Sequence, residues 1–116
     1  MGRYQYRVYV IELRKQVFSE NAKFRAANLH FNGMLECLYV GMTSKDPKVR
    51  FQEHRRGHRN RKGHNLSASI VRKYGTYLRG SLYNHIPPMD SRAEALRMEK
   101  ELTLKLRRQG YAVWSN

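Results

Sequence analysis

The chain has 116 residues, which is enough for one domain and too little for two ordinary cores. Lys and Arg total 23 against nine Asp and Glu, so the formal net charge is +14, while 41% of the residues are hydrophobic. That apolar fraction excludes a disordered basic tail, and the apolar runs are too short to span a bilayer. The single cysteine, Cys37, excludes an internal disulfide framework, and we expect a cytoplasmic protein.

A charge of this size repels itself unless an anionic partner compensates it, and a polymer of phosphates is the usual partner. Arg outnumbers Lys fifteen to eight. Because the guanidinium group binds phosphate through a planar fork of donors, this bias favours direct phosphate contacts over a merely solubilising surface. We therefore expect a nucleic acid as the partner. The alternative is a basic protein with no nucleic-acid role.

The first half of the chain is predicted to form two strands and a helix. Residues 4–13 are rich in β-branched and aromatic side chains, which is typical of a strand, and residues 35–41 are predicted as the second strand. Because the two strands are consecutive, we expect them to pair antiparallel. Residues 14–34 between them are interpreted as an irregular insertion with room for one helical turn. Asp46 and Pro47 then begin a helix.

The middle of the chain is predicted to be a basic loop followed by a short helix and a third strand. Residues 55–64 contain five Arg or Lys and two His, which indicates a loop that faces an anion. Residues 67–73 are predicted as a short helix. Residues 77–86 are predicted as a strand, which two consecutive prolines end.

The last helix is the clearest prediction. Ser91 and Glu94 have the spacing of a capping box. Apolar side chains then recur at helical spacing: Ala95, Met98, Leu102 and Leu106. Gly110 ends the helix, and residues 111–114 are an apolar tail expected to return to the sheet. The chain is therefore predicted to be a single α+β domain over residues 1–116.

Glu99 is an unusual carboxylate because it lies on the flank of this apolar stripe. Its neighbours at three and four residues are Ala95, Leu96, Leu102 and Thr103, none of which is basic. A carboxylate without a local partner in an Arg-rich chain needs another cation, which could be a divalent metal or a distant arginine. The alternative is a Glu at the rim of the helix that simply reaches water.

Two further pairs have a spacing that suits chemistry on a phosphate. Arg50 and His54 are four residues apart and share one helix face, so they could hold one phosphate and move a proton. Tyr9 and Tyr39 lie in the two strands predicted to be neighbours. The alternatives are a solvated helix face for the first pair and ordinary cross-strand packing for the second.

Taken together, these residues resemble the GIY-YIG nuclease superfamily over nearly the whole chain. The similar segments, in chain order, are residues 7–11 for the GIY strand, 38–43 for the YIG strand with its following threonine, 50–54 for the Arg-x-x-x-His helix, 73–75 for the Lys-Tyr-Gly segment and 94–99 for the helix with the metal-binding Glu. Two departures stand out. Arg7 replaces the glycine of GIY, and the segment between the two strand motifs is longer than the family's short hairpin.

The resemblance implies a small three-stranded mixed or antiparallel sheet flanked by about three helices, and a divalent-metal-dependent endonuclease acting on DNA. It implies that Glu99 holds one Mg²⁺ or Mn²⁺. The resemblance implies further roles: Tyr9 as general base or as the group that orients the attacking water, Tyr39 in positioning water or phosphate, Arg50 in stabilising the pentacovalent phosphate, His54 in proton movement and Asn116 in supporting the site.

The basic loop is expected to contact DNA phosphates without reading bases. The residues expected to do so are Arg55, Arg56, Arg59, Arg61 and Lys62. Aromatic and Arg side chains in this loop and in the insertion suit stacking on unpaired bases, so single-stranded DNA stays open beside duplex or branched DNA. The alternatives to a nuclease are a non-catalytic nucleic-acid-binding module of the same fold and a structural RNA-binding protein.

Overall fold

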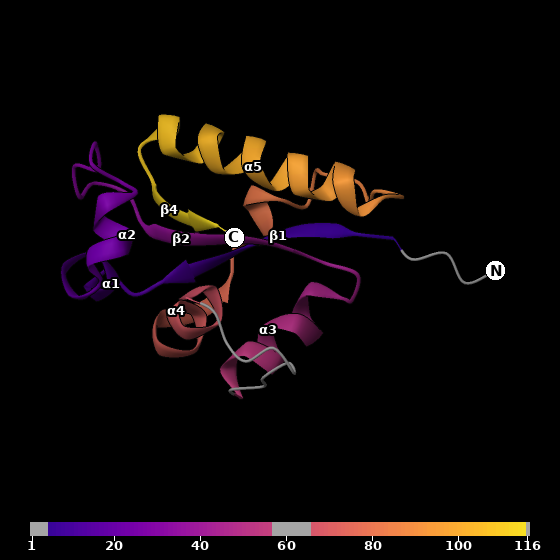
Figure 1. Cartoon of the computed structure of the whole chain (residues 1–116), viewed down its shortest axis with the longest axis horizontal. Coiled ribbons are helices and arrows are strands. Elements are labelled where there is room, and N and C mark those ends of the chain that lie inside the picture. The colour runs from indigo at the N-terminus through magenta and orange to yellow at the C-terminus, as the bar shows by residue number, and fades with distance from the viewer. Residues whose placement is uncertain (1–4, 57–65, 116) are drawn as a thin grey trace.

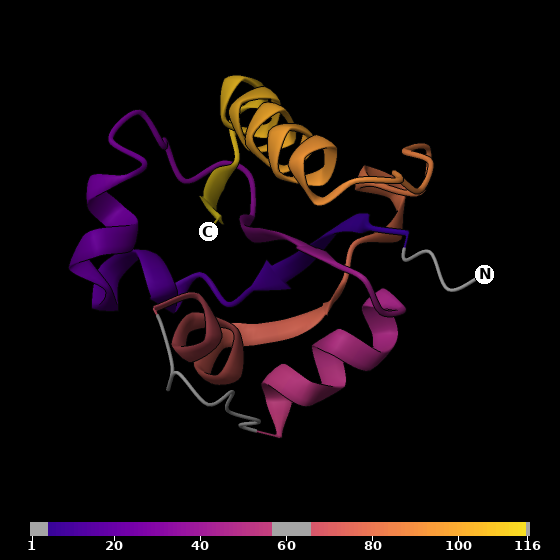
Figure 2. The same ribbon diagram turned by 45° about the vertical axis from the view of Figure 1, so that its right-hand side comes forward.

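The computed structural model describes residues 5–56 and 66–115, and within them one sheet has helices on both faces (Figure 1). α5 (Arg92–Gln109) lies across one face, while α3 (Pro47–Arg55) and α4 (Leu66–Tyr74) lie on the other, as Figure 2 also shows. The predicted α+β class is therefore confirmed. No helix in the described part of the chain is long and apolar enough to cross a membrane.

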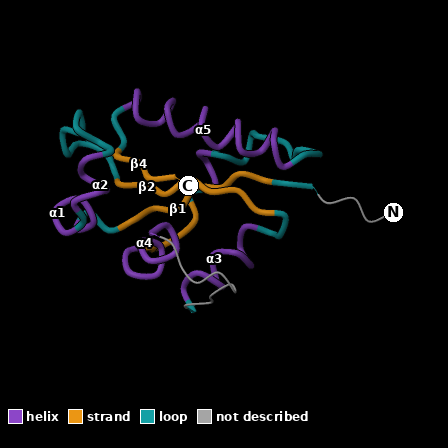
Figure 3. The backbone as a smooth tube through the Cα atoms, in the orientation of Figure 1, coloured by secondary structure: helices purple, strands orange, loops and turns teal. Residues whose placement is uncertain are grey.

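The sheet has four strands in the order β3-β1-β2-β4, one more than predicted (Figure 3). β1 (Arg7–Leu13) pairs antiparallel with β2 (Cys37–Thr43), as expected for consecutive strands, and also with β3 (Gly75–Leu78). β4 (Ala112–Ser115) pairs parallel with β2, so the apolar tail does return to the sheet. The tail thus supplies the extra strand.

The two central strands are buried on both faces because their side chains alternate between two cores. One core lies under α5, and β1 and β2 contribute to it Val8, Val10, Leu38 and Val40. The other lies under α3 and α4, and the same strands contribute to it Tyr9, Ile11, Leu13, Cys37 and Tyr39. Both tyrosines therefore project toward α3 and α4.

The insertion is more regular than the sequence predicts. It holds two five-residue helices, α1 (Gln16–Glu20) and α2 (Ala22–Ala26). Asn21 separates them and caps the second one, because its side-chain oxygen accepts a hydrogen bond from the Phe24 backbone N–H at 2.9 Å. The Val17 and Phe24 side chains are fully buried, so they anchor both helices to the core.

Asn28, just after α2, ties the insertion to the edge of the sheet. Its side-chain amide donates to the Val113 carbonyl at 3.1 Å and accepts from the Val113 N–H at 2.7 Å. The amide therefore pairs with β4 as a neighbouring strand would, and satisfies edge groups that would otherwise need another partner.

The third strand is shorter than predicted. β3 ends at Leu78, and a single 3₁₀ turn, η1 (Gly80–Leu82), follows it. The Arg79 backbone N–H still donates to the Val10 carbonyl in β1 at 2.8 Å. The Arg79 guanidinium group forms ion pairs with the Glu12 and Glu36 carboxylates at 2.9 and 3.1 Å. The chain then turns at Gly80, which ends the pairing.

The helix ends agree with the capping residues seen in the sequence. Asp46 begins α3 by accepting from the Lys48 N–H at 2.8 Å, and Ser91 begins α5 by accepting from the Glu94 N–H at 3.1 Å. Gly110 ends α5 in the left-handed conformation with φ of 112°, which side chains disfavour. α5 therefore runs over the predicted length and carries Glu99 near its middle.

Candidate active site

The two tyrosines sit on neighbouring strands with their rings packed over a glycine. Tyr9 lies opposite Gly41 in the β1–β2 register, and its ring centroid is 6.1 Å from that of Tyr39. Both side chains are almost fully buried. A Cβ atom on Gly41 would lie only 2.7 Å from the Tyr9 hydroxyl oxygen and 2.8 Å from the Tyr39 ring. The glycine therefore lets both rings lie close to the strand backbone.

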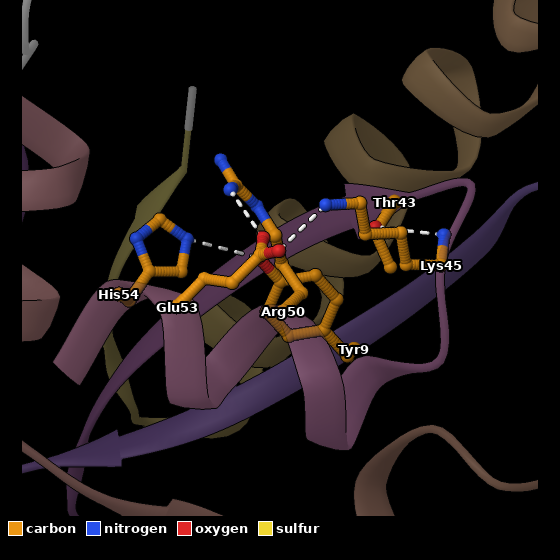
Figure 4. Close-up of polar contacts among 6 residues, drawn as sticks. All are labelled: Tyr9, Thr43, Lys45, Arg50, Glu53 and His54. Atoms are coloured by element: carbon orange, nitrogen blue, oxygen red, sulfur yellow. Dashed lines mark hydrogen bonds and ion pairs between the residues drawn. The ribbon is translucent and has the colours of Figure 1, made fainter. Parts of the chain in front are cut away.

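His54 lies on α3 directly above the tyrosines. Its Nε2 atom is 3.5 Å from the Tyr9 hydroxyl, at the outer limit of a hydrogen bond (Figure 4). The His54 ring also meets the Tyr39 ring edge-on, with the ring centroids 6.1 Å apart. Burial, with a smaller effect from the Arg50 charge, lowers the pKa of His54 to about 4. The imidazole is therefore neutral at pH 7, and its lowered pKa makes it a weak base.

The Tyr9 phenol is held in its neutral form. Burial raises its pKa well above 10, and the neighbouring Tyr39 raises it further, while the Arg50 charge opposes the shift. Tyr9 by itself is therefore a poor base at neutral pH, and a proton that leaves its hydroxyl would need His54 as the acceptor.

Arg50 lies one helical turn before His54 and is held by a carboxylate between them. Glu53 accepts from the Arg50 guanidinium at 3.2 Å and from the Lys45 ammonium at 2.6 Å (Figure 4). These two cations, Lys45 first, lower the pKa of Glu53 below its usual range. The Arg50 side chain remains 34% exposed, so its guanidinium can still meet a phosphate from solvent.

Glu53 was missed in the sequence analysis, although its spacing gives a signal. It lies three residues after Arg50, which places the two side chains on one helix face. Its position beside Lys45 depends on the loop that joins β2 to α3, where the Thr43 hydroxyl accepts from the Lys45 N–H at 3.0 Å. Glu53 orients Arg50 and is not itself aimed at Tyr9.

Glu99 on α5 is 3% exposed, and its Oε2 atom has no hydrogen-bond partner in the described part of the chain. Burial raises the pKa of Glu99 to about 7, and the Arg92 charge only partly opposes this. The Glu99 charge also raises the pKa of Tyr9, so its field reaches the phenol from the other face of the sheet. Glu99 is therefore not a carboxylate at the rim of the helix that reaches water.

Glu99 and the tyrosine cluster lie on opposite faces of the sheet, because α5 covers one face and the tyrosines project toward α3 and α4 on the other. Within the described chain, β4 pairs with β2 up to Val40, which lies opposite Ser115. Gly41, where the tyrosines pack, comes next along β2. A hollow lined by Glu99 and Ser115 opens at the same end of β4.

The residues fit a metal bound through a single carboxylate. An unpartnered, buried carboxylate oxygen is the group that a divalent cation would satisfy. Among residues 5–56 and 66–115, no three His, Cys, Asp or Glu side chains gather into a metal-binding cluster. A cation at Glu99 would therefore keep water and substrate oxygens as its other ligands, which is the usual state of Mg²⁺.

The remaining predicted site residues lie apart or outside the described chain. Arg55 and Arg56 are exposed at the end of α3, where the Arg55 guanidinium lies 5.5 Å from the Phe51 ring centroid. The other predicted residues lie outside the described residues: Arg59, Arg61, Lys62 and Asn116. Comparison of the chain with protein-family models, curated proteins and solved structures returns no match.

Proposed function

We propose that the chain is a divalent-metal-dependent endonuclease that hydrolyses DNA phosphodiester bonds, of the GIY-YIG type that its motifs resemble. The observation that carries the proposal is the buried Glu99 carboxylate, whose Oε2 atom has no hydrogen-bond partner among residues 5–56 and 66–115. A protein that only binds phosphates needs surface cations. It has no need for a desolvated carboxylate, which opposes anion binding and costs stability.

Tyr9 and His54 would handle the attacking water together. The Tyr9 hydroxyl accepts from or donates to the water and so orients it. The imidazole, 3.5 Å from that hydroxyl and neutral at pH 7, would assist the movement of the proton. Tyr39, packed against both side chains, would position the water or the phosphate.

Arg50 would hold the scissile phosphate and neutralise the charge that develops on it. Glu53 fixes the guanidinium from behind, which reduces the rotamer entropy lost when the phosphate binds. Glu99 would hold one Mg²⁺ or Mn²⁺. When bound, such a cation supplies Lewis-acid stabilisation of the phosphate and leaving oxygens.

The test is magnesium-dependent cleavage of matched single- and double-stranded labelled oligonucleotides, with EDTA as the blank. Cleavage by the wild type that is lost in Glu99→Ala supports the proposal. Glu101→Ala is the matched control, since Glu101 is an exposed carboxylate on the same helix. If the protein binds the oligonucleotides but cleaves them with neither Mg²⁺ nor Mn²⁺, the nuclease proposal is refuted. That result would favour the alternative, a non-catalytic nucleic-acid-binding module of the same fold.

A further inference from the structure

The flank of α5 beside Glu99 is hollowed along the helix. One hollow, of about 710 Å³, is lined by Glu99 together with the cationic side chains of Arg97, Lys100 and Arg107. Its lining continues past Leu104 toward the C-terminal end of the helix. Between Glu99 and Arg107 the helix rises by about 12 Å.

A second hollow adjoins the first, because Leu104 and Arg107 line both. It has a volume of about 470 Å³, within the range of roughly 300–1,000 Å³ typical of ligand sites. Its wall is mostly apolar and includes Leu29 and Phe31 from the insertion and Tyr111 after α5. We name the two hollows together the α5 groove.

The α5 groove combines free cations with exposed apolar side chains. Within residues 5–56 and 66–115, the ion pairs involve Lys45, Arg50 and Arg79, and neither Arg97 nor Lys100 takes part in one. At the other end, Leu29 is 79% exposed and Leu104 is 46% exposed. An unpaired strand is held by cations along its phosphates and by aromatic rings on which bases stack, and the Phe31 and Tyr111 rings stand beside these leucines in the wall of the second hollow.

We propose that the α5 groove binds a single-stranded segment of nucleic acid, with phosphates on Arg97 and Lys100 and an unstacked base against Leu29 and Leu104. The proposal rests on the proposed function, because Glu99 lines the groove and marks the end nearest the cut. In a duplex the bases stay stacked inside the helix, so a duplex could offer phosphates to the cations but no base to the apolar hollow.

The first measurement tests the cations by fluorescence anisotropy of a labelled single-stranded oligonucleotide, in EDTA so that no cleavage occurs. Arg97→Gln with Lys100→Gln is expected to weaken binding by about tenfold at low salt. Lys23→Gln with Lys105→Gln removes the same charge from exposed positions that line neither hollow, and should cost less than about threefold. Equal loss in both double variants would overturn the groove as the binding path.

The second measurement tests the apolar hollow. Leu29→Ser is expected to weaken single-strand binding by about threefold to tenfold and to leave duplex binding unchanged, since stacking on an apolar surface is lost. Met34→Ser is the matched control, because Met34 is 76% exposed in the same insertion and does not line the hollow. Loss of single-strand and duplex binding alike, or no loss, would overturn the assignment of a base to this hollow.

The two proposals fail in different ways. If the nuclease proposal is wrong, the wild type binds the oligonucleotide and leaves it intact with Mg²⁺ or Mn²⁺. If the groove proposal is wrong, the wild type cleaves, while the variants at Arg97, Lys100 and Leu29 bind and cleave like their controls. Melting temperatures of all variants should match the wild type within a few degrees, because each substituted side chain is largely solvent-exposed.

Discussion

Replacing Glu99 by glutamine should stabilise the metal-free protein above neutral pH. The pKa of Glu99 is about 7 in the folded chain against an ordinary 4.5, so between these values the folded state binds more protons than the unfolded state. The ionisation of Glu99 therefore leaves the free energy of unfolding of the wild type unchanged below about pH 4.5 and lowers it as the pH rises to about 7. Glutamine keeps the shape of the neutral acid and removes this loss.

The magnitude follows from the size of the pKa change. At about 1.4 kcal/mol for each factor of ten in the ionisation constant, a rise from 4.5 to about 7 corresponds to about 3 kcal/mol. The carboxylate is 3% exposed, so solvent screening reduces this little. In a domain of this size, the melting temperature of Glu99→Gln should exceed that of the wild type by on the order of 10 °C at about pH 8 and match it at about pH 4.5.

The assay is thermal unfolding followed by circular dichroism across this pH range in EDTA, with Glu101→Gln as the control. Added Mg²⁺ should then raise the melting temperature of the wild type and leave that of Glu99→Gln unchanged, because binding to the folded state alone stabilises it. If Glu99→Gln is no more stable than the wild type at about pH 8, then the ionised Glu99 carboxylate does not destabilise the fold, and the explanation from its burial is refuted.

Three further outcomes are expected. Tyr9→Phe should keep the fold and DNA affinity and reduce single-turnover cleavage by roughly 10²–10⁴-fold, the usual worth of a positioned acid or base, whereas wild-type cleavage would leave Tyr9 a packing residue. His54→Asn should abolish the loss of stability that the wild type suffers as the pH falls from 6.5 to about 4, since the pKa of His54 is lowered in the folded state; an unchanged slope in acid titrations of the free energy of unfolding would contradict this. Neutralising both Arg55 and Arg56 removes two phosphate contacts, so the slope of log K against log salt should become less steep by about 1.5 in total. An unaltered slope would show that DNA does not pass the end of α3.

The sequence predicts the two central strands and the long helix well because their signals are local. The β-branched and aromatic runs of β1 and β2 and the capped, periodic pattern of α5 are complete within each segment, so the helix that carries Glu99 and its lack of a basic neighbour could both be predicted. The two helices of the insertion could not, because five residues are too few to establish a helical period.

Contacts between segments that are distant in the chain could not be predicted from the sequence either. The spacing of Glu53 predicts its contact with Arg50, but its contact with Lys45 depends on the loop that joins β2 to α3. The ion pairs of Arg79 with Glu12 and Glu36 also join residues far apart in the sequence. The burial of His54, which lowers its pKa, depends on how α3 packs against the sheet, and a helical position alone does not determine it.

The Asn28 amide has a consequence for the kinetics of folding. It joins the insertion to β4 across 85 residues of chain, so the contact closes a long loop and carries a large entropic cost before it contributes any stability. We expect this contact to form after the rate-limiting barrier has been crossed, because other contacts must first bring the two segments together. The pair between Asn28 and Val113 should therefore slow the unfolding of the domain and have little influence on how fast it folds. In this way the insertion contributes to the lifetime of the native state.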